Sequence, residues 1–423
     1  MFRIPASRWF LCGATSLMVF LFLAVLLAGL MLTYRSYQPR FGEVAGNSME
    51  PSLQGPRYLV TCGSCQTVIP FTVDAWNPNR PAICPCCGQP VIADDALPVQ
   101  RGETIQYLPP QRLRRRSKAP GADKVLRGDI VVLEREAGSI KELKRVVGLP
   151  NETITLREGD LWINDQRHEK TLRETLSQSV LVAVWDPRFS DQYLDGFLDS
   201  LSLPPTNELP INAHDSHLLI PTSDIGIALR CEEPMRQGRL AMVLWDMSHR
   251  YEIEVVLHED WSVTCNGLTV PQQTSRLKPE GAYSNWIILA MIDGRLLIGD
   301  ESGRCLASPL DSLRTTAEES HDESHRSRMV ITRRDIPEID LAIVFRDLVY
   351  RGYGDAAEET IPQGPGYVVL GDNVSISDDS RGPAGGSVRW DLERIKGVVL
   401  SDNDDLASLL RQAEMWRSCG TRH

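Results

Sequence analysis

The sequence predicts a mainly β protein whose body follows a single N-terminal transmembrane helix. Three observations lead to this fold class. The run Trp9–Leu32 carries no charged residue. The segment Tyr251–Leu257 alternates apolar and polar residues in part, as a half-buried strand does. The segments Trp286–Ile292 and Arg295–Ile298 flank Asp293-Gly294, a pair that suits the positive φ angles of a type I′ hairpin turn.

Length and composition bound the classes of protein that this chain can belong to. It has 423 residues, of which 42% are hydrophobic and 24% charged. These values fit two or three globular domains, and they exclude a disordered chain and a transporter with many membrane spans. The formal net charge of −11 argues against a nucleic-acid-binding protein, which would normally be basic.

The N-terminal apolar run is long enough for a membrane anchor. Its 24 residues would give a helix of roughly 36 Å, which spans a bilayer core. A cleaved secretory signal would have a shorter apolar stretch. Arg3 and Arg8 make the short flank positive, so the positive-inside rule favours a cytoplasmic N-terminus over residues 1–8 and an anchor over 9–33. The rest of the chain is then expected to lie outside the cell membrane.

Changes of composition divide the remainder into one β core and two insertions. The core pieces are residues 34–60, 125–167 and 361–402, and the C-terminal helix and tail follow at 403–423. A cysteine-rich insertion covers 61–95, and a basic linker that contains prolines covers 96–124. The large insertion, 168–360, is predicted to be a β-sandwich-like domain, because several short alternating segments join its hairpin.

The core pieces contain their own strand signals. A strand is expected after Gly128-Asp129, and Thr153–Leu156 with Leu161–Ile163 should form a pair typical of small β barrels. Leu392–Leu400 is predicted to be the last core strand, and Asp405–Trp416 a short amphipathic helix.

The cysteine cluster predicts a zinc ribbon. Cys62 and Cys65 form one Cys-x₂-Cys pair, and Cys84 and Cys87 form a second pair. Two such pairs can hold Zn²⁺ in a closed tetrahedral site, which is structural rather than catalytic. Cys86 is a surplus thiol that could replace a ligand of the second pair. The alternative is a pair of disulfides, because an extracytoplasmic compartment can be oxidising.

Three motifs resemble the bacterial type I signal peptidases, which are Ser–Lys endopeptidases. Gly-Asn-Ser-Met-Glu-Pro-Ser-Leu covers 46–53, Lys-Arg-Val-Val-Gly-Leu-Pro-Asn-Glu covers 144–152, and Gly-Asp-Asn-Val-Ser-Ile-Ser-Asp-Asp-Ser-Arg covers 371–381. They occur in this order behind the apolar segment. The resemblance covers about a third of the chain and implies an antiparallel β signal-peptidase-like catalytic core.

The resemblance implies that Ser48 is the nucleophile and Lys144 the general base. A serine hydroxyl needs a positioned base, and a lysine amine can serve only when burial or a cationic neighbour keeps it unprotonated. Leu143, Val146 and Val147 surround Lys144 with apolar side chains, which is consistent with that role. Lys141 is the competing base, but the pattern of the family matches at 144.

Supporting roles are also implied by the resemblance. Ser377 would hydrogen-bond the lysine amine, Asp379 and Arg381 would form a bracing charged pair, and Arg145 is expected to partner Asp379. The backbone N–H of Ser48 would serve the oxyanion hole. Three features depart from the family: Gly46 lacks the side-chain donor that many relatives carry, Val374 replaces an arginine, and Gly-Pro-Ala-Gly-Gly (382–386) replaces an aromatic-glycine step.

The resulting function is a membrane-bound serine endopeptidase that removes N-terminal signal peptides from exported proteins after small-x-small sites. Its expected partners are preproteins that bear signal peptides, the lipid bilayer and the protein-export machinery, with no nucleic acid. The expected location is the cell (inner) membrane, with one span. Catalysis itself should need no cofactor. Two alternatives remain: a membrane-anchored docking protein with a vestigial protease core, and a processing peptidase of narrow specificity.

Overall fold

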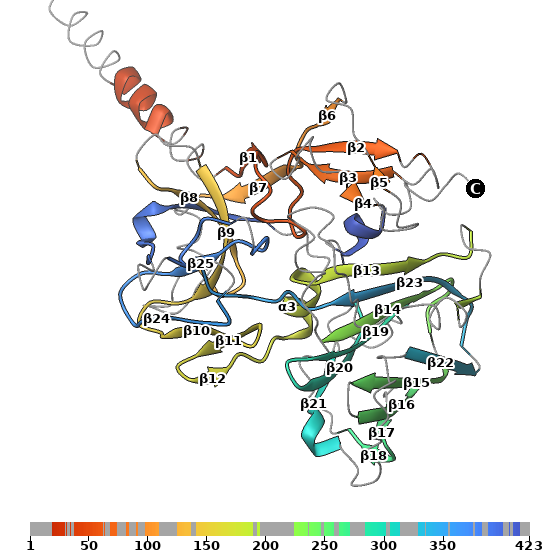
Figure 1. Ribbon diagram of the computed structural model, residues 1–423. Coiled ribbons are helices and arrows are strands. Elements are labelled where there is room, and N and C mark those ends of the chain that lie inside the picture. The colour runs from red at the N-terminus through yellow and green to blue at the C-terminus, as the bar shows by residue number, and fades with distance from the viewer. Residues whose placement is uncertain are drawn as a thin grey trace, which may run out of the picture.

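A computed structural model gives the architecture of the chain (Figure 1). The residues that it describes are 19–29, 31, 34, 38–61, 63, 68–73, 82–83, 90–91, 98–109, 125–136, 141–188, 193–194, 224–235, 237–246, 249–257, 262–270, 284–301, 305–313, 329–334, 336–353, 356–374, 377–382, 388–400, 406 and 409–414. These residues form a mainly β protein in which every strand pair is antiparallel, as the sequence predicts.

The first large sheet gathers strands from four distant parts of the chain. Its order is β1-β7-β26-β8-β9-β25. The bounds are β1 Arg40–Glu43, β7 Thr104–Leu108, β8 Ile130–Glu134, β9 Lys141–Gly148, β25 Val368–Leu370 and β26 Ile395–Val399. The predicted strand after Gly128-Asp129 is therefore β8. The predicted last core strand, Leu392–Leu400, is β26 only from Ile395, because Leu392–Arg394 forms a 3₁₀ turn, η5. Apolar side chains of β8, β9, β25 and β26 share one buried cluster, which holds these four strands together.

A four-stranded sheet follows β9 and has the order β12-β11-β10-β24. Its bounds are β10 Ile154–Arg157, β11 Asp160–Ile163, β12 Gln166–Arg167 and β24 Glu358–Ile361. The expected pair is confirmed, because Ile154 of β10 lies opposite Ile163 of β11. The loop Asn164-Asp165 between β11 and β12 has positive φ at both residues, which suits Asn and Asp in a tight turn.

Two small sheets lie in the segment that contains the cysteine pairs. One has the order β3-β2-β6, with β2 Arg57–Thr61, β3 Val68–Thr72 and β6 Val99–Gln100, and the other pairs β4 Ala82–Ile83 with β5 Pro90–Val91. Cys62, Cys65, Cys84 and Cys87 all fall outside the described residues. The zinc ribbon therefore stays a prediction.

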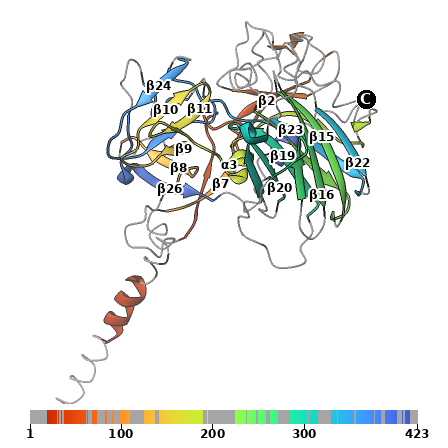
Figure 2. The ribbon, with the colours of Figure 1, turned by 90° about the horizontal axis from the view of Figure 1, so that it is seen from below.

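Residues 180–346 form two further sheets, which we call the second β unit (Figure 2). The six-stranded sheet β13-β23-β14-β19-β20-β21 contains β13 Val180–Trp185, β14 Ile225–Cys231, β19 Trp286–Ile292, β20 Arg295–Gly299, β21 Cys305–Pro309 and β23 Ile339–Arg346. The five-stranded sheet β18-β17-β16-β15-β22 contains β15 Gly238–Asp246, β16 His249–Leu257, β17 Ser262–Cys265, β18 Leu268–Thr269 and β22 Met329–Arg334. A 3₁₀ turn, η2 Leu310–Leu313, follows β21. One buried cluster combines side chains of both sheets, so they pack face to face as the sequence predicts.

The predicted hairpin of this unit is confirmed. Trp286–Ile292 pairs with Arg295–Gly299, and the two turn residues have φ of 53° at Asp293 and 68° at Gly294. Both φ angles are positive, as a type I′ turn requires. This turn places the Asp293 carboxylate at the end of the unit that faces the four-stranded sheet.

Two short helices cover the outer face of the six-stranded sheet. The first is α3, Leu172–Ser177, which the sequence analysis did not predict. The second is the C-terminal helix, described at residues 409–414, inside the predicted helix Asp405–Trp416. Leu172 and Leu176 of α3, together with Leu409, pack against that face. Burial of these leucines attaches both helices to the second β unit.

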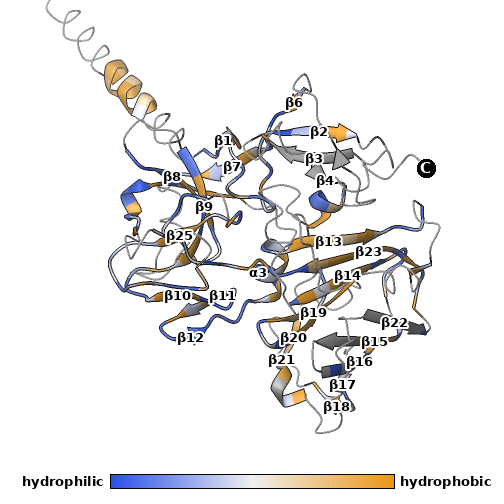
Figure 3. Ribbon diagram, in the orientation of Figure 1, coloured by the Kyte–Doolittle hydropathy of each residue, from blue (hydrophilic) through white to orange (hydrophobic). Residues whose placement is uncertain are grey.

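The described part of the N-terminal segment, residues 19–29, is helical and apolar (Figure 3). Its large side chains are exposed; Phe20 and Val25, for example, are 71% and 70% exposed. No helix among the described residues is long and apolar enough to cross a membrane. The expected anchor over 9–33 lies partly outside these residues and stays a prediction.

Candidate active site

The first motif forms a tight turn between β1 and β2. Glu50 donates its backbone N–H to the carbonyl of Asn47 at 3.2 Å, and Leu53 donates to Met49 at 3.0 Å. The Met49 and Leu53 side chains are buried and hold the turn against the first sheet. Ser48 is half-buried within this turn. Ser48 is therefore a half-buried serine in a segment whose neighbouring apolar side chains are buried.

Lys144 lies in the middle of β9, between β8 and β25, opposite Val131 of β8. Only 3% of the residue is exposed. Its Nζ donates a hydrogen bond to Ser377 Oγ at 2.9 Å. Burial lowers the pKa of Lys144 below its ordinary value, since the ammonium form loses its hydration, although nearby carboxylates oppose the shift. The lysine is therefore biased toward the neutral amine that a general base requires.

The third motif brings the other two together. It begins directly after β25, and Asn373 donates its backbone N–H to the Ser48 carbonyl at 3.0 Å. Ser377 closes the loop by donating its N–H to the carbonyl of Asn373 at 3.1 Å. Gly371 sits so close to Ser377 Oγ and to the Ser48 carbonyl that a Cβ would overlap both atoms. A side chain at 371 would push these serines apart, so this glycine is required for their close approach.

The three motifs are thus neighbours, but the described hydrogen bonds connect Lys144 to Ser377 rather than to Ser48. Among the described residues no hydrogen bond joins Lys144 Nζ and Ser48 Oγ. Hydrogen bonds between catalytic groups are often long before substrate binds. Ser377 lies in the position expected of it, where it directs the amine.

One expected ion pair is wrong. Arg145 pairs with Asp372, not with Asp379: its Nη2 lies 2.6 Å from Asp372 Oδ2, and its Nε lies 2.9 Å from Oδ1. Asp379 instead accepts from Arg381, with Nη2 to Oδ2 at 2.7 Å and Nε to Oδ1 at 2.8 Å. Arg145 points to the face of β9 opposite Lys144, where Asp372 is the available carboxylate. The pairing of Asp379 with Arg381 agrees with the expectation for these two residues.

Asp372 is a residue of the site that the sequence analysis did not select. It is fully buried, and it neutralises a guanidinium that is itself 98% buried. The signal was present, because Asp372 stands in the Gly-Asp-Asn stretch of the third motif. Asp379 also accepts the backbone N–H of Gly371 at 3.0 Å, so both carboxylates fix the loop that carries Ser377.

The departures from the family pattern at Gly46 and Val374 have simple local consequences. Gly46 offers no side-chain donor, and no atom lies within 4 Å of where its Cβ would be. The backbone N–H of Ser48 makes no hydrogen bond to any described residue, so it is available to a developing oxyanion. Val374 is buried in an apolar cluster with Val368 and Leu370, so a hydrophobic contact takes the place of a charged side chain there.

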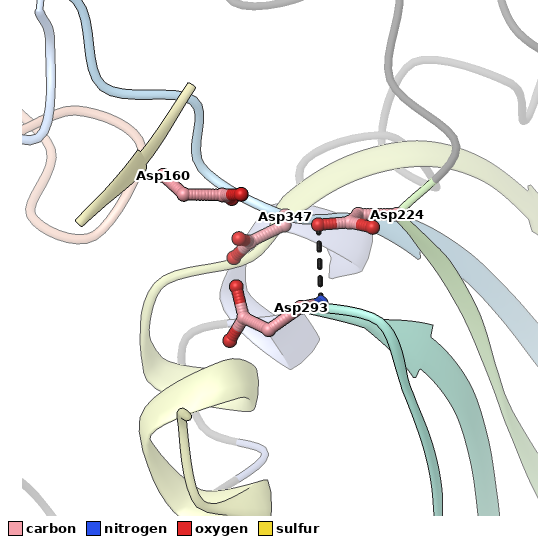
Figure 4. Close-up of side chains that lie close together, drawn as sticks. All are labelled: Asp160, Asp224, Asp293 and Asp347. Carbon is pink, nitrogen blue, oxygen red and sulfur yellow. Dashed lines mark hydrogen bonds between the residues drawn. The ribbon is translucent and has the colours of Figure 1, made fainter. Parts of the chain in front are cut away.

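A second concentration of ionisable groups lies where the four-stranded sheet meets the second β unit (Figure 4). The carboxylates of Asp160, Asp224, Asp293 and Asp347 offer oxygens that all lie within 4.8 Å of one another. The Lys170 ammonium bonds Asp347 and lies 3.8 Å from Asp293, and Arg167 lies 2.7 Å from Asp160. Positive side chains therefore already face the cluster, and we treat it as an ion-pair network and assign no metal to it.

Part of the chain matches the model of a known protein family. Residues 14–188 fit the family model described as signal peptidase, peptidase S26. No curated protein matches the chain. The matched segment contains Ser48, Lys144 and Arg145 but ends before Ser377, Asp379 and Arg381. Residues 14–188, which include the loop of Ser48 and the strand of Lys144, are therefore similar to the signal peptidase family, peptidase S26.

Proposed function

We propose that the chain is a membrane-bound signal peptidase in which Ser48 is the nucleophile and Lys144 the general base. The match of residues 14–188 to the signal peptidase family supports a signal peptidase-type serine peptidase. The observation that carries the finer proposal is the buried amine of Lys144, hydrogen-bonded at 2.9 Å to Ser377 Oγ in a loop that also binds the Ser48 backbone. A buried lysine with an acceptor that orients it has the two properties that a general base needs.

The proposed reaction proceeds through an acyl-enzyme. Ser48 Oγ attacks the scissile carbonyl, and its proton passes to Lys144 Nζ, which needs the unprotonated amine. The backbone N–H of Ser48 donates to the oxyanion of the tetrahedral intermediate. Lys144 then gives its proton to the leaving amine and accepts one from the water that hydrolyses the ester of Ser48.

The proposed substrates are preproteins that carry N-terminal signal peptides, cut after small-x-small sites. We place the N-terminus in the cytoplasm, the anchor at 9–33 in the cell membrane and the catalytic body outside it, next to the protein-export machinery. This arrangement rests on the uncharged run Trp9–Leu32 and its positive short flank. Zn²⁺ bound by Cys62, Cys65, Cys84 and Cys87 is proposed as a structural ion only, because four thiolates leave no open position for chemistry.

Cleavage of a precursor with an Ala-x-Ala site tests the proposal. We expect the full-length protein in detergent to cut after that site, and Ser48→Ala and Lys144→Ala each to abolish cleavage. Lys141→Ala is the matched control, because Lys141 begins the same strand, is exposed and bonds only Tyr107 Oη, at 3.4 Å, among the described residues. That variant should cleave like the wild type.

Three other outcomes would contradict the proposal in different ways. Cleavage that survives Ser48→Ala would exclude this nucleophile. Loss of activity in Lys141→Ala but not in Lys144→Ala would assign the base to the other lysine. Absence of cleavage by folded wild-type protein would favour the peptidase of narrow specificity or the docking protein, and cleavage of native preproteins would separate these two.

A further inference from the structure

A short hydrogen-bond chain joins the nucleophile turn to the end of α3. Ser52 Oγ donates to the carbonyl of Ser177 at 3.1 Å and accepts from Arg145 Nη2 at 3.1 Å. Arg145 Nη2 also reaches the Ser177 carbonyl, at 3.3 Å. Ser52 and Arg145 are 4% and 2% exposed, so the contacts are shielded from water. Residues 52, 145 and 177 thus meet at one point; we call this contact the Ser52 clamp.

The second β unit fixes the α3 side of the clamp. α3 starts with a capping box, in which Thr171 Oγ1 accepts from the Glu174 N–H at 3.2 Å and Glu174 Oε2 accepts from the Thr171 N–H at 2.8 Å. Leu172 and Leu176 pack on the six-stranded sheet. The last carbonyls of a helix have no partner within the helix. The Ser177 carbonyl therefore needs donors from elsewhere, and the Ser52 clamp supplies two.

Ser48 and Ser52 lie in the same hydrogen-bonded turn, so a contact that fixes Ser52 also restricts the position of Ser48. Only three residues separate them, and the hydrogen bonds Glu50 N–H to Asn47 and Leu53 N–H to Met49 close the turn over this stretch. On the other side, Arg145 is the residue after Lys144 and points to the opposite face of β9. The Ser52 clamp therefore holds the segments of both proposed catalytic residues.

We infer that Ser52 is a positioning residue, through which the second β unit sets the position of the Ser48 hydroxyl relative to Lys144. This inference rests on the proposed Ser48/Lys144 peptidase and assigns a role to the second β unit. Loss of the Ser52 hydroxyl would release the turn from α3 while Arg145 keeps its carboxylate partner, Asp372. A displacement of about 1 Å between reacting groups can cost about 100-fold in rate.

The test compares Ser52→Ala with two matched variants. Ser52→Thr keeps the hydroxyl. Ser179→Ala removes another buried serine hydroxyl near the same helix end, since Ser179 Oγ donates to the Thr175 carbonyl at 2.6 Å and does not contact the turn. We expect Ser52→Ala to lower kcat about 10- to 100-fold with KM changed less than about twofold. Ser52→Thr should recover most of kcat, and Ser179→Ala should keep it within about twofold of the wild type.

Two further readouts separate positioning from general destabilisation. A released turn admits water to Lys144, which raises the pKa of the amine, so the acid limb of kcat/KM should move to higher pH in Ser52→Ala but not in Ser179→Ala. Amide hydrogen exchange at residues 46–53 should quicken in Ser52→Ala alone.

Equal kcat and equal exchange in Ser52→Ala and Ser179→Ala would overturn the inference. If the wild-type protein shows no Ser48-dependent cleavage, the proposed function is refuted instead. In that case, faster amide exchange at residues 46–53 in Ser52→Ala would still establish the Ser52 clamp. Unchanged exchange there would refute the clamp as well.

Discussion

At the residue scale, Lys144 is subject to opposing influences on its charge. Burial is the largest and lowers the pKa of the amine. The carboxylates of Asp379, Glu142 and Asp378 act in the other direction, and the guanidinium of Arg135 assists burial by repelling a second positive charge. Arg135 and Asp378 form an ion pair at 2.8 Å outside the proposed dyad, so each can be changed without touching a catalytic group.

Opposite shifts of the pH profile are therefore expected from this pair. Arg135→Gln removes a charge that lowers the pKa of Lys144, so the acid limb of kcat/KM should move to higher pH. Asp378→Asn removes a charge that raises this pKa, so the limb should move to lower pH. Precursor cleavage measured from about pH 6 to about pH 10 covers the range below the ordinary lysine pKa.

Arg157→Gln provides the control for this experiment, because Arg157 pairs with Glu358 on the four-stranded sheet, at 2.8 Å. Its acid limb should coincide with that of the wild type. Shifts of the same sign in Arg135→Gln and Asp378→Asn would show that Lys144 is not the group that titrates.

Ser377 yields a second prediction at this scale. Its hydroxyl is the acceptor for Lys144 Nζ at 2.9 Å, so Ser377→Ala leaves the amine without its direction toward the nucleophile. We expect kcat to fall about tenfold and KM to stay within about twofold, as determined by steady-state cleavage of the precursor.

The matched variant is Ser380→Ala in the same loop, because Ser380 Oγ accepts from the Val369 N–H at 2.9 Å and does not contact Lys144. Ser380→Ala should lower the free energy of unfolding. Its kcat, corrected for the fraction of folded protein, should fall much less than that of Ser377→Ala. A Ser377→Ala enzyme with wild-type kcat would show that the lysine finds its position without this hydroxyl.

At the scale of elements, local signals predicted the structure well. The β19–β20 hairpin follows from Asp293-Gly294, and the β10–β11 pair follows from two alternating segments with a short turn. The sheet order could not be predicted, because β24 pairs with β10, some two hundred residues earlier, and local pattern does not encode such a partner. α3 escaped prediction because its six residues are few for a helical period, although Thr171 and Glu174 carry a capping-box pattern.

The wrong partner of Arg145 has a similar cause. The third motif holds both Asp372 and Asp379, and the choice between them depends on which face of β9 each one meets. Arg145 lies opposite Leu370 of β25, so the next carboxylate along the chain, Asp372, reaches its guanidinium. Residue types therefore indicated candidate residues but not Asp372, whereas the register of β25 on β9 decided the contacts of Arg145.

The cysteine pairs support a prediction about an element that lies outside the described residues. Purified full-length protein should contain about one Zn²⁺ per chain, as four thiolates fit one tetrahedral site. Metal analysis should find this zinc lost in Cys62→Ser and retained in Cys305→Ser, because Cys305 is a free thiol of the second β unit. Protein without zinc, in which thiols appear at 62, 65, 84 and 87 only after reduction, would establish disulfides instead.

At the scale of the whole molecule, the acidic cluster of Asp160, Asp224, Asp293 and Asp347 joins the four-stranded sheet to the second β unit. Asp160 belongs to the four-stranded sheet, Asp224 and Asp293 belong to the second β unit, and Asp347 directly follows β23, the last strand of that unit (Figure 4). Four carboxylates face two cationic side chains, Lys170 and Arg167. If all four carboxylates were ionised, the cluster would carry more negative than positive charge. Protonation of a carboxylate reduces this excess.

The shifts of pKa show how this excess is accommodated. Burial raises the pKa of Asp160 to about 6, and burial together with the charges of Asp347 and Asp293 raises the pKa of Asp224 to about 8. In the unfolded chain an aspartate titrates near pH 4. A raised folded-state pKa means that the folded state binds the proton more tightly. Proton binding by these two aspartates therefore stabilises the folded state. This contribution to the free energy of unfolding is complete below about pH 4, and it is lost as the pH rises through about 6 for Asp160 and about 8 for Asp224.

Stability should therefore fall toward alkaline pH through this cluster, and Asp224→Asn should reduce the fall. At about pH 9 the variant should unfold with a free energy higher than that of the wild type by on the order of 2 kcal/mol, since each pKa unit is worth about 1.4 kcal/mol and coupling shares the shift among the carboxylates. At about pH 5 most of this difference should vanish, because Asp224 is then protonated in the folded state. Denaturant unfolding at both pH values measures it. The asparagine carbonyl can still accept the Asp293 N–H, as Asp224 Oδ2 does at 3.2 Å.

Asp340→Asn is the control that separates this cluster from carboxylates in general. Asp340 lies on β23, the strand that Asp347 directly follows. Unlike Asp347, Asp340 forms an ordinary ion pair with Arg230, at 2.8 Å. Its removal should weaken the protein slightly at both pH values, because a pair of this exposure is worth about 0–1 kcal/mol. If Asp224→Asn also weakens the protein at about pH 9, then Asp224 is ionised and stabilising there. The carboxylates at the contact between the four-stranded sheet and the second β unit would then be ionised rather than protonated.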